Sequence, residues 1–291
     1  MADKNLELRG SVAVVTGAAS GIGAALARVL AVRGCALALA DRDATGLAKA
    51  ALAARANGVT VSEHVLDVAD ADAVAALPAA VLAAHGRVNV LVNNAGVALV
   101  GRFDQVSMED FEWLFNINFW GVVRMTRAFL PLLRQEGTAQ LVNLSSVYGL
   151  IAPPGETAYA ASKFAVRGFT EALRHELDGS PVGVTVVHPG GIRTSVALNA
   201  RKAEALTPDE VAKGMAVFKL LTRTEPEEAA EVIARGIERR DSRVLIGKDA
   251  RQIATLVRLF PVGYWPRMQK SVARTIRRAT RGDAAPKTAH G

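Results

Sequence analysis

The stretch ETAYAASKFAV, residues 156–166, contains one tyrosine and one lysine four positions apart. In a helix, Tyr159 and Lys163 lie on one face, so the lysine ammonium is close to the phenol. A nearby positive charge favours the phenolate, and the sequence therefore predicts a pKa for Tyr159 below the usual value of about 10. Such a tyrosine suits general acid–base catalysis. An ordinary helix with a half-buried Tyr159 produces the same pattern, so the pair alone does not define an active site.

A glycine-rich stretch, TGAASGIGAA at residues 16–25, lies between an apolar run and a helical pattern. Gly17, Gly21 and Gly23 would allow a tight turn, a close approach of the backbone to a pyrophosphate, and packing of the helix on a sheet. The free N–H groups and the positive dipole end of that helix would bind the phosphates. The spacing is Gly-x-x-x-Gly-x-Gly rather than Gly-x-Gly-x-x-Gly. Its place between a strand and a helix predicts a dinucleotide site.

An acidic residue ends the second apolar run of the chain. Asp41 is where a carboxylate would hydrogen-bond the adenosine ribose hydroxyls, and it would repel the 2′-phosphate of NADP. The neighbouring Arg42 suits that phosphate, whereas Ser20 in the glycine turn adds no positive charge. This balance favours NAD over NADP. A second interpretation is that Asp41 only caps a helix that starts at Asp43.

The glycine turn is the first of many strand-to-helix junctions. Short β-type runs alternate with helical segments long enough to be crossover connections, which is typical of a parallel sheet. With 50% hydrophobic and only 5% aromatic residues, the core must consist of Ala, Val, Leu and Ile. The sequence predicts an α/β fold with a single Rossmann-type, doubly wound, parallel seven-stranded sheet and helices on both faces. The expected strands lie in 12–17, 35–41, 59–68, 88–96, 139–146, 183–191 and 243–247.

No change in composition marks a second domain before the end of this alternation. Residues 1–248 are therefore expected to form one dinucleotide-binding catalytic domain, and 249–291 a basic amphipathic extension that is partly disordered at its end. The stretch of about 194–224 follows the sixth strand, where it would cover a ligand as a lid. A short helix is expected there, starting near Thr207 with Pro208 at its first position.

With these elements in place, residues of about 8–248 resemble the short-chain dehydrogenase/reductase family in its single-domain form. Seven motifs occur in the order that this family shows, each at a strand end or a helix start. Ser146 is preferred to Ser145 because it precedes Tyr159 by the 13 residues usual in the family. The motifs are Thr16-Gly17-x-x-x-Gly21-x-Gly23, Asp67-Val68, Asn93-Asn94-Ala95-Gly96, Asn118, Ser146, Tyr159-x-x-x-Lys163 and Pro189-Gly190.

The resemblance implies an alcohol dehydrogenase or carbonyl reductase and a catalytic set of four residues. Tyr159 would exchange a proton with the reacting oxygen, and Ser146 would hydrogen-bond that oxygen. Lys163 would hold the nicotinamide ribose and keep Tyr159 acidic. Asn118, preferred to Asn116 because Gly121 follows it at the family's spacing, would steady a water that links Lys163 to solvent.

The resemblance also implies contacts with NAD or NADP. Asp67 would bind the adenine amino group and Val68 its ring, while Asn93 to Gly96 would stabilise the fourth strand and flank the adenosine. Pro189, with the residues after it, would contact the nicotinamide end. The full set is Gly17, Ser20, Gly21, Ile22, Gly23, Asp41, Arg42, Asp67, Val68, Asn94, Ala95, Gly96, Tyr159, Lys163, Pro189, Gly190, Ile192 and Thr194.

The substrate is expected to be a hydrophobic secondary alcohol or ketone. The lid contains Met215 and Phe218 among Ala, Leu and Val, and Leu99, Tyr148 and Leu150 follow strand ends, although all of these could simply pack in the core. A sugar or a carrier-bound 3-oxoacyl chain is the alternative substrate. By analogy with the family, a homodimer or homotetramer is expected through helices at about 107–136 and 157–178.

The net charge of +7 is concentrated at the end of the chain. Residues 264–291 contain seven Lys and Arg and one Asp, so they carry +6, and the other 263 residues carry +1. Apolar residues recur at helical spacing in 250–265 and 267–281, so 264–281 could contact a membrane surface. An oligomer contact or a helix that covers the lid is the other possibility. No recognised nucleic-acid-binding module supports DNA or RNA binding.

The remaining composition excludes several classes of protein. Cys35 is the single cysteine, which rules out an internal disulfide and favours a buried apolar role. No cluster has metal-ligand spacing, so no metal is expected, and His175 and Glu176 would lie on a solvated helix face. The polar start and the lack of a long apolar stretch predict a cytoplasmic protein. A non-catalytic dinucleotide-binding module and a membrane-recruited scaffold are the rival functions.

Overall fold

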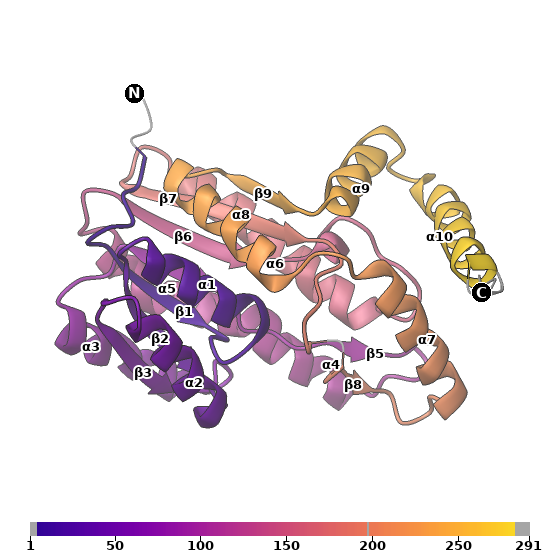
Figure 1. The fold of residues 1–291 in the computed structure, drawn as a ribbon, viewed down its shortest axis with the longest axis horizontal. Coiled ribbons are helices and arrows are strands. Elements are labelled where there is room, and N and C mark those ends of the chain that lie inside the picture. The colour runs from indigo at the N-terminus through magenta and orange to yellow at the C-terminus, as the bar shows by residue number, and fades with distance from the viewer. Residues whose placement is uncertain (1–4, 197, 283–291) are drawn as a thin grey trace, which may run out of the picture.

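A computed structural model describes residues 5–196 and 198–282, and its centre is a parallel sheet of seven strands (Figure 1). The central strands follow apolar runs because a sheet covered on both faces buries nearly every side chain, whereas the edge strand Val61–Val65 has polar and exposed residues. The strand order is β3-β2-β1-β4-β6-β7-β9, and every neighbouring pair is parallel, as predicted. The strands are β1 (Val12–Thr16), β2 (Ala36–Asp41), β3 (Val61–Val65), β4 (Val90–Asn93), β6 (Ala139–Leu144), β7 (Val182–Pro189) and β9 (Arg243–Ile246).

Helices cover both faces of this sheet and form two apolar cores. Successive residues of β1 alternate between them, since Ala13 and Val15 belong to the first core and Val14 to the second. Cys35 is fully buried in the first core, as predicted. The chain order reverses between β1 and β4, which is the switch point where open α/β sheets bind ligands. The first core includes α1 (Gly21–Val32), α2 (Ala44–Arg55) and α8 (Pro226–Arg239), and the second α3 (Ala71–His85), α5 (Gly121–Leu133) and α6 (Thr157–Glu176).

Several short elements near the carboxyl edge of the sheet were not predicted. A second, two-stranded parallel sheet joins the loop after β4 to the segment of about 194–224 that the sequence predicts as a lid, and so ties this segment to the body through main-chain bonds. A π-helix lies directly before α5, and a 3₁₀-helix lies directly after Ser146. These elements are β5 (Leu99–Val100), β8 (Arg201–Lys202), the π-helix Asn116–Trp120 and the 3₁₀-helix Val147–Gly149, whereas α4 (Met108–Phe115) lies within the helical region expected at about 107–136.

The lid and the C-terminal extension are helical. The lid helix α7 (Pro208–Leu221) starts as predicted, and Thr207 and Glu210 form a capping box at its N-terminus. Two further helices follow the sheet, α9 (Lys248–Leu259) and α10 (Tyr264–Gly282), and α10 contacts α7 (Figure 1). Among the described residues, no helix combines the length and apolar character that spanning a membrane requires. The predicted disorder at the end of the extension concerns 283–291, which lie outside the described residues.

Candidate active site

The glycine turn after β1 has the geometry that a close phosphate contact requires. Gly17 and Gly21 have φ angles of +65° and +52°, which residues with a Cβ seldom adopt. A Cβ on Gly23 would lie 2.0 Å from the main-chain oxygen of Gly17, so a side chain there would push α1 away from the turn. Ser20 is the N-cap of α1, yet its side chain makes no capping bond, and Ile22 packs on the core. The first turn of α1 thus fits a pyrophosphate.

Asp41 joins the glycine turn to the residue that precedes α2. Its carboxylate accepts hydrogen bonds from the main-chain nitrogens of Ala19 at 2.9 Å and Asp43 at 3.0 Å. The side chain that caps α2 is that of Asp43, so the interpretation of Asp41 as only a helix cap is wrong. Arg42 beside it is exposed. A carboxylate next to the pyrophosphate turn suits ribose hydroxyls.

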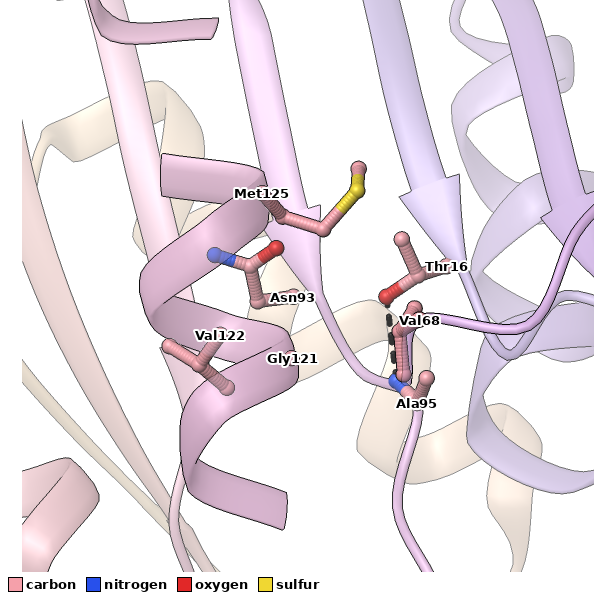
Figure 2. Close-up of a pocket in the computed structure, with 7 residues that line it drawn as sticks. All are labelled: Thr16, Val68, Asn93, Ala95, Gly121, Val122 and Met125. Atoms are coloured by element: carbon pink, nitrogen blue, oxygen red, sulfur yellow. Dashed lines mark hydrogen bonds between the residues drawn. The ribbon is translucent and has the colours of Figure 1, made fainter. Parts of the chain in front are cut away.

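A small pocket opens beside the glycine turn at the switch point (Figure 2). Val68, which follows β3, forms one wall and packs on α5, where a Cβ on Gly121 would lie 2.8 Å from its side chain. The carboxylate of Asp67 accepts a bond from the nitrogen of Ala69 at 2.9 Å and so fixes the turn that presents Val68. The pocket is lined by Thr16, Val68, Asn93, Ala95, Gly121, Val122 and Met125.

The loop after β4 joins the glycine turn to the tyrosine helix. The side-chain amide of Asn94 donates to the main-chain oxygens of Thr16 at 2.9 Å and Gly17 at 3.0 Å. The Thr16 hydroxyl accepts a bond at 3.1 Å from the nitrogen of Ala95, drawn in Figure 2. A Cβ on Gly96 would lie 3.5 Å from Nζ of Lys163. The loop therefore brings the expected nucleotide site next to the expected catalytic residues.

Ser146 and Tyr159 contact each other, and Ser145 is directed elsewhere. The Ser146 hydroxyl accepts a bond from the nitrogen of Tyr148 at 3.1 Å, and the same side chain hydrogen-bonds the phenol of Tyr159. Ser145 is buried, and its hydroxyl donates to the main-chain oxygen of Lys163 at 2.9 Å. This geometry agrees with the preference for Ser146 that the spacing suggested.

Lys163 and Asn118 are buried behind the tyrosine. Nζ of Lys163 lies 5.7 Å from the ring centre of Tyr159 and donates to the main-chain oxygen of Leu144 at 3.1 Å. The side-chain amide of Asn118, in the π-helix, donates to the oxygen of Val97 at 2.9 Å and to the hydroxyl of Ser162 at 3.2 Å. Both N–H groups of the Asn118 amide already donate hydrogen bonds within the protein. A water could therefore bind to Asn118 only by donating a hydrogen bond to one of its oxygen atoms.

The pKa values at this site correct one expectation. Burial and the negative charge of Glu156 raise the pKa of Tyr159 to about 12. The hydrogen bond from Ser146 lowers this pKa, but by less. Burial lowers the pKa of Lys163 to about 8. The prediction of a pKa for Tyr159 below about 10 is therefore wrong, because loss of water around the phenol disfavours the phenolate.

The residues after β7 form the far wall of the site. A Cβ on Gly21 of the glycine turn would lie 3.2 Å from the side chain of Thr194, so this loop closes over the turn. Ile192 is buried in the first core, which leaves its main chain for any ligand contact. Asp249, at the start of α9, accepts a bond from the nitrogen of Gly191 at 2.7 Å, and a Cβ on Gly190 would lie 2.3 Å from its carboxylate.

Three residues near this site were not identified from the sequence. Asp249 holds the loop after β7, His188 makes a 2.8 Å hydrogen bond to the main-chain oxygen of Ser146, and Glu156 lies close to Tyr159. Only Glu156, three positions before Tyr159, could have been suspected from the helical spacing. The partners of the other two are distant in sequence.

The side chains proposed to line a substrate site divide into two groups. Leu99 and Leu150 are buried, with Leu99 packed against Leu114, so the packing interpretation holds for both. Tyr148 is half-buried, and its ring meets that of Tyr159 edge to face at a centroid distance of 5.9 Å. Among the described residues, no group of His, Cys, Asp and Glu could hold a metal ion.

A parallel doubly wound sheet with a glycine turn at its switch point defines a dinucleotide-binding protein of the Rossmann type. Residues 11–205 match the family model described as short chain dehydrogenase. The chain is also 45% identical over 267 residues to the putative oxidoreductase SadH of Mycobacterium tuberculosis, covering 91% of this chain and 96% of that protein. It belongs to the short-chain dehydrogenase/reductase family and is an oxidoreductase with an NAD(P)-binding fold.

Solved structures are similar over most of the chain. A short-chain dehydrogenase/reductase from Burkholderia phymatum in complex with NAD has a TM-score of 0.81 and 32% identity, covering 88% of this chain and 95% of that one. An alcohol dehydrogenase from the archaeon Thermococcus sibiricus, in complex with 5-hydroxy-NADP, has a TM-score of 0.69 and 31% identity, covering 80% and 93%. Relatives with this fold thus bind either type of nicotinamide cofactor.

Proposed function

We propose that this protein interconverts a secondary alcohol and a ketone by hydride transfer, with Tyr159 as the general acid and base. The observation that supports it best is the contact between Tyr159 and Ser146, together with the position of Lys163, from the same helix as Tyr159, close to Gly96 on the nucleotide side of the sheet. A bound nicotinamide dinucleotide would accept or supply the hydride. A non-catalytic binding module has no need of a half-buried tyrosine that hydrogen-bonds a serine.

The residues of the chain have separate tasks in this proposal. Tyr159 holds a proton, which it donates to the carbonyl oxygen during reduction and takes from the hydroxyl during oxidation. Ser146 hydrogen-bonds the same oxygen and stabilises the charge that develops on it. Lys163 holds the nicotinamide ribose, and an oxygen of Asn118 holds a water near Lys163.

The proposed cofactor is NAD rather than NADP. The carboxylate of Asp41 is fixed by the nitrogens of Ala19 and Asp43, so it cannot turn away from a 2′-phosphate without losing two hydrogen bonds. Arg42 is exposed, and its guanidinium suits the 2′-phosphate of NADP, which would favour NADP instead. The ratio of kcat/KM for NAD to that for NADP is therefore a direct test.

The proposed substrate is hydrophobic. In the helix α7, Met215 and Phe218 are half-buried, although α7 has no fully buried residue, so these apolar side chains are not enclosed in a core. A carrier-bound 3-oxoacyl chain is the alternative. A cytoplasmic location stays a prediction.

The test is a panel of apolar secondary alcohols and their ketones with each cofactor, followed by the absorbance of the reduced nicotinamide. Replacing Tyr159 by Phe should lower kcat about 10²- to 10⁴-fold and leave cofactor binding unchanged. The matched control is Tyr264→Phe, in α10. Full activity of the Tyr159 variant would exclude the mechanism.

A homodimer or homotetramer is the proposed assembly. Trp120 in the π-helix and Phe164 in α6 are 50% and 40% exposed, and both lie within the helices expected to pair. Light scattering on Trp120→Asp and Phe164→Asp should show smaller species than the unchanged chain. An unchanged mass in both variants would exclude this interface.

A second proposed activity is peripheral attachment to an anionic bilayer through the turn between α9 and α10. Leu259 and Val262 in this turn are 65% and 90% exposed, while Arg267 stacks on Phe260 at 4.0 Å. From 250 to 282 the sequence has eight Lys and Arg and no acidic residue. Exposed apolar side chains within a basic segment match the chemistry of an anionic lipid surface.

The structure limits how α10 could take part in this attachment. Trp265 and Met268 are half-buried, and the hydroxyl of Tyr264 accepts a bond at 3.1 Å from the nitrogen of Ala152. The inner side of α10 thus packs on the body, as the lid-covering interpretation expects, and the turn is the part that remains exposed.

Vesicle sedimentation tests this attachment. The chain should bind phosphatidylcholine vesicles that contain phosphatidylserine, more weakly in high salt, and Leu259→Asp combined with Val262→Asp should abolish binding. The matched control, Val32→Asp with Leu52→Asp, changes two equally exposed apolar residues elsewhere and should bind normally. Undiminished binding by the turn variant would exclude the proposal.

A further inference from the structure

Glu156 occupies an unusual position for a carboxylate at a helix start. It is the N-cap of α6, but its side chain makes no capping hydrogen bond. Its main chain is fixed from outside the helix, since Glu156 forms a parallel bridge with Gly101, whose nitrogen donates to the oxygen of Gly155 at 3.0 Å. The side chain is half-buried, so it does not lie fully in solvent. It also makes no hydrogen bond to the N–H groups at the start of α6.

Glu156 is the N-cap of α6 and Tyr159 is the third residue of that helix, so the two side chains start within one helical turn of each other. Tyr148, from the 3₁₀-helix, and Tyr159, one turn into α6, meet edge to face, and the charge of Glu156 raises the pKa of each. Among the described residues, Glu156 has no ion-pair partner, and Nζ of Lys163 is directed to the oxygen of Leu144. Because no cation compensates its burial, the pKa of Glu156 is raised to about 8.

We infer that Glu156 acts through Tyr159, by keeping the proton on that phenol, and so biases the site toward carbonyl reduction. This inference rests on the proposed function, in which Tyr159 exchanges the proton of the reacting oxygen. The groups that act on the phenol are Ser146, which hydrogen-bonds it, Lys163 on its own helix, Tyr148 and Glu156.

The physical reason is the order in which two neighbouring acids lose their protons. Glu156 ionises first, and its negative charge then opposes formation of a second negative charge on Tyr159. Tyr159 consequently keeps its proton at alkaline pH, where it can still donate to a carbonyl oxygen. Oxidation of an alcohol needs the opposite state, a phenolate that accepts a proton, and Glu156 disfavours this state.

The informative variant is Glu156→Gln, with Glu176→Gln as the matched control. Glutamine has the size and the neutral charge of the protonated Glu156 side chain, so it should be tolerated at this position. Glu176 is exposed at the far end of α6, and its replacement changes the net charge equally. Glu156→Met, also uncharged and of similar length, separates the effect of the charge from that of the amide.

The first measurement is the pH dependence of kcat/KM in both directions. In Glu156→Gln, the alkaline fall of ketone reduction and the rise of alcohol oxidation should both move to lower pH by about one unit. Between about pH 8, where Glu156 ionises, and that range, oxidation should then be about tenfold faster than in the unchanged chain, and below pH 8 the two should not differ. Glu156→Met should show the same shift, and Glu176→Gln none. Profiles of both Glu156 variants that superimpose on that of the unchanged chain would overturn the inference.

The second measurement does not depend on turnover. The chain has three tyrosines, so phenolate formation can be followed by ultraviolet absorbance and assigned with Tyr159→Phe. The Tyr159 titration should move to lower pH in Glu156→Gln. If it moves while no substrate is turned over, the inference holds and the proposed reaction fails. If turnover is found but neither the titration nor the rate profile moves, the reaction holds and the inference fails.

Discussion

Nδ1 of His188 lies 2.8 Å from the main-chain oxygen of Ser146, at the carboxyl ends of two neighbouring strands. Burial lowers the pKa of His188 to about 4, so the ring is neutral at neutral pH. A carbonyl oxygen can only accept, which assigns the proton to Nδ1. Nε2 is buried and has no hydrogen-bond partner in the described part of the chain. His188 therefore fixes the backbone that presents the Ser146 hydroxyl.

Replacing His188 by Leu should lower kcat more than it raises the KM for the cofactor. The variant removes one of two donors to the Ser146 carbonyl, the other being the nitrogen of Gly149, which costs about 0.5–1.5 kcal/mol, and it lets the Ser146 loop move away from Tyr159. The expected fall in kcat is about tenfold. His188→Asn, which keeps an N–H donor, should recover part of it. The control is His175→Leu on the exposed face of α6. A change in cofactor KM alone would contradict this positioning role.

The strands and the helix that carries the catalytic pair could be predicted because their signals are local. The largely apolar runs VAVVT and ALALAD identify buried parallel strands, and the spacing of Tyr159 and Lys163 fixes their common face. The same holds for the capping box at Thr207, in which all partners lie within one turn.

The contacts that hold the loops could not be predicted because they join residues that are distant in the sequence. His188 and Ser146 are 42 residues apart, and Asp249 and Gly191 are 58 apart, so neither pair leaves a pattern in a short window. The pairing of β5 with β8 joins residues that are still farther apart in sequence, 99–100 and 201–202.

The pKa of Tyr159 failed as a prediction because it depends on burial. The sequence shows that a lysine is nearby, but not that the phenol loses its water or that the carboxyl of Glu156 is close to it. Desolvation opposes the charged form whatever the neighbour, so the direction of the shift follows from packing.

Asp41→Ser should change the preference between cofactors. Removing the carboxylate and leaving Arg42 beside the site removes a repulsion toward the 2′-phosphate of NADP. The ratio of kcat/KM for NAD over NADP should fall by about tenfold or more, which corresponds to 1.4 kcal/mol or more. Asp43→Ser, which alters the residue that caps α2, is the control and should leave the ratio unchanged. An unaltered ratio in Asp41→Ser would show that Asp41 does not select the cofactor.

Asp249→Ala should weaken binding of the nicotinamide end. The carboxylate accepts a 2.7 Å bond from the nitrogen of Gly191, and without it the loop after β7 loses its fixed position. A lost charge-assisted bond of this kind costs about 1.5–3 kcal/mol, so the dissociation constant for NADH should rise by about tenfold or more. Fluorescence titration with NADH measures this. Adenosine diphosphate ribose, which lacks the nicotinamide, is the control ligand and should bind both proteins equally.

Glu156→Gln should also make the protein more stable at alkaline pH. A carboxyl whose pKa is raised to about 8 in the folded chain, from an ordinary 4.5, favours folding below pH 4.5 and loses that contribution as the pH rises to 8. Glutamine does not titrate, so the melting temperature of the variant relative to the unchanged chain should increase from pH 4.5 to 8. A gain of at least about 2 °C is expected, which is what 1 kcal/mol produces in a domain of this size. Glu176→Gln should show no such trend. If the difference between Glu156→Gln and the unchanged chain stays constant over this range, the carboxyl of Glu156 is ionised throughout it, and its burial beside Tyr159 has no effect on the charge.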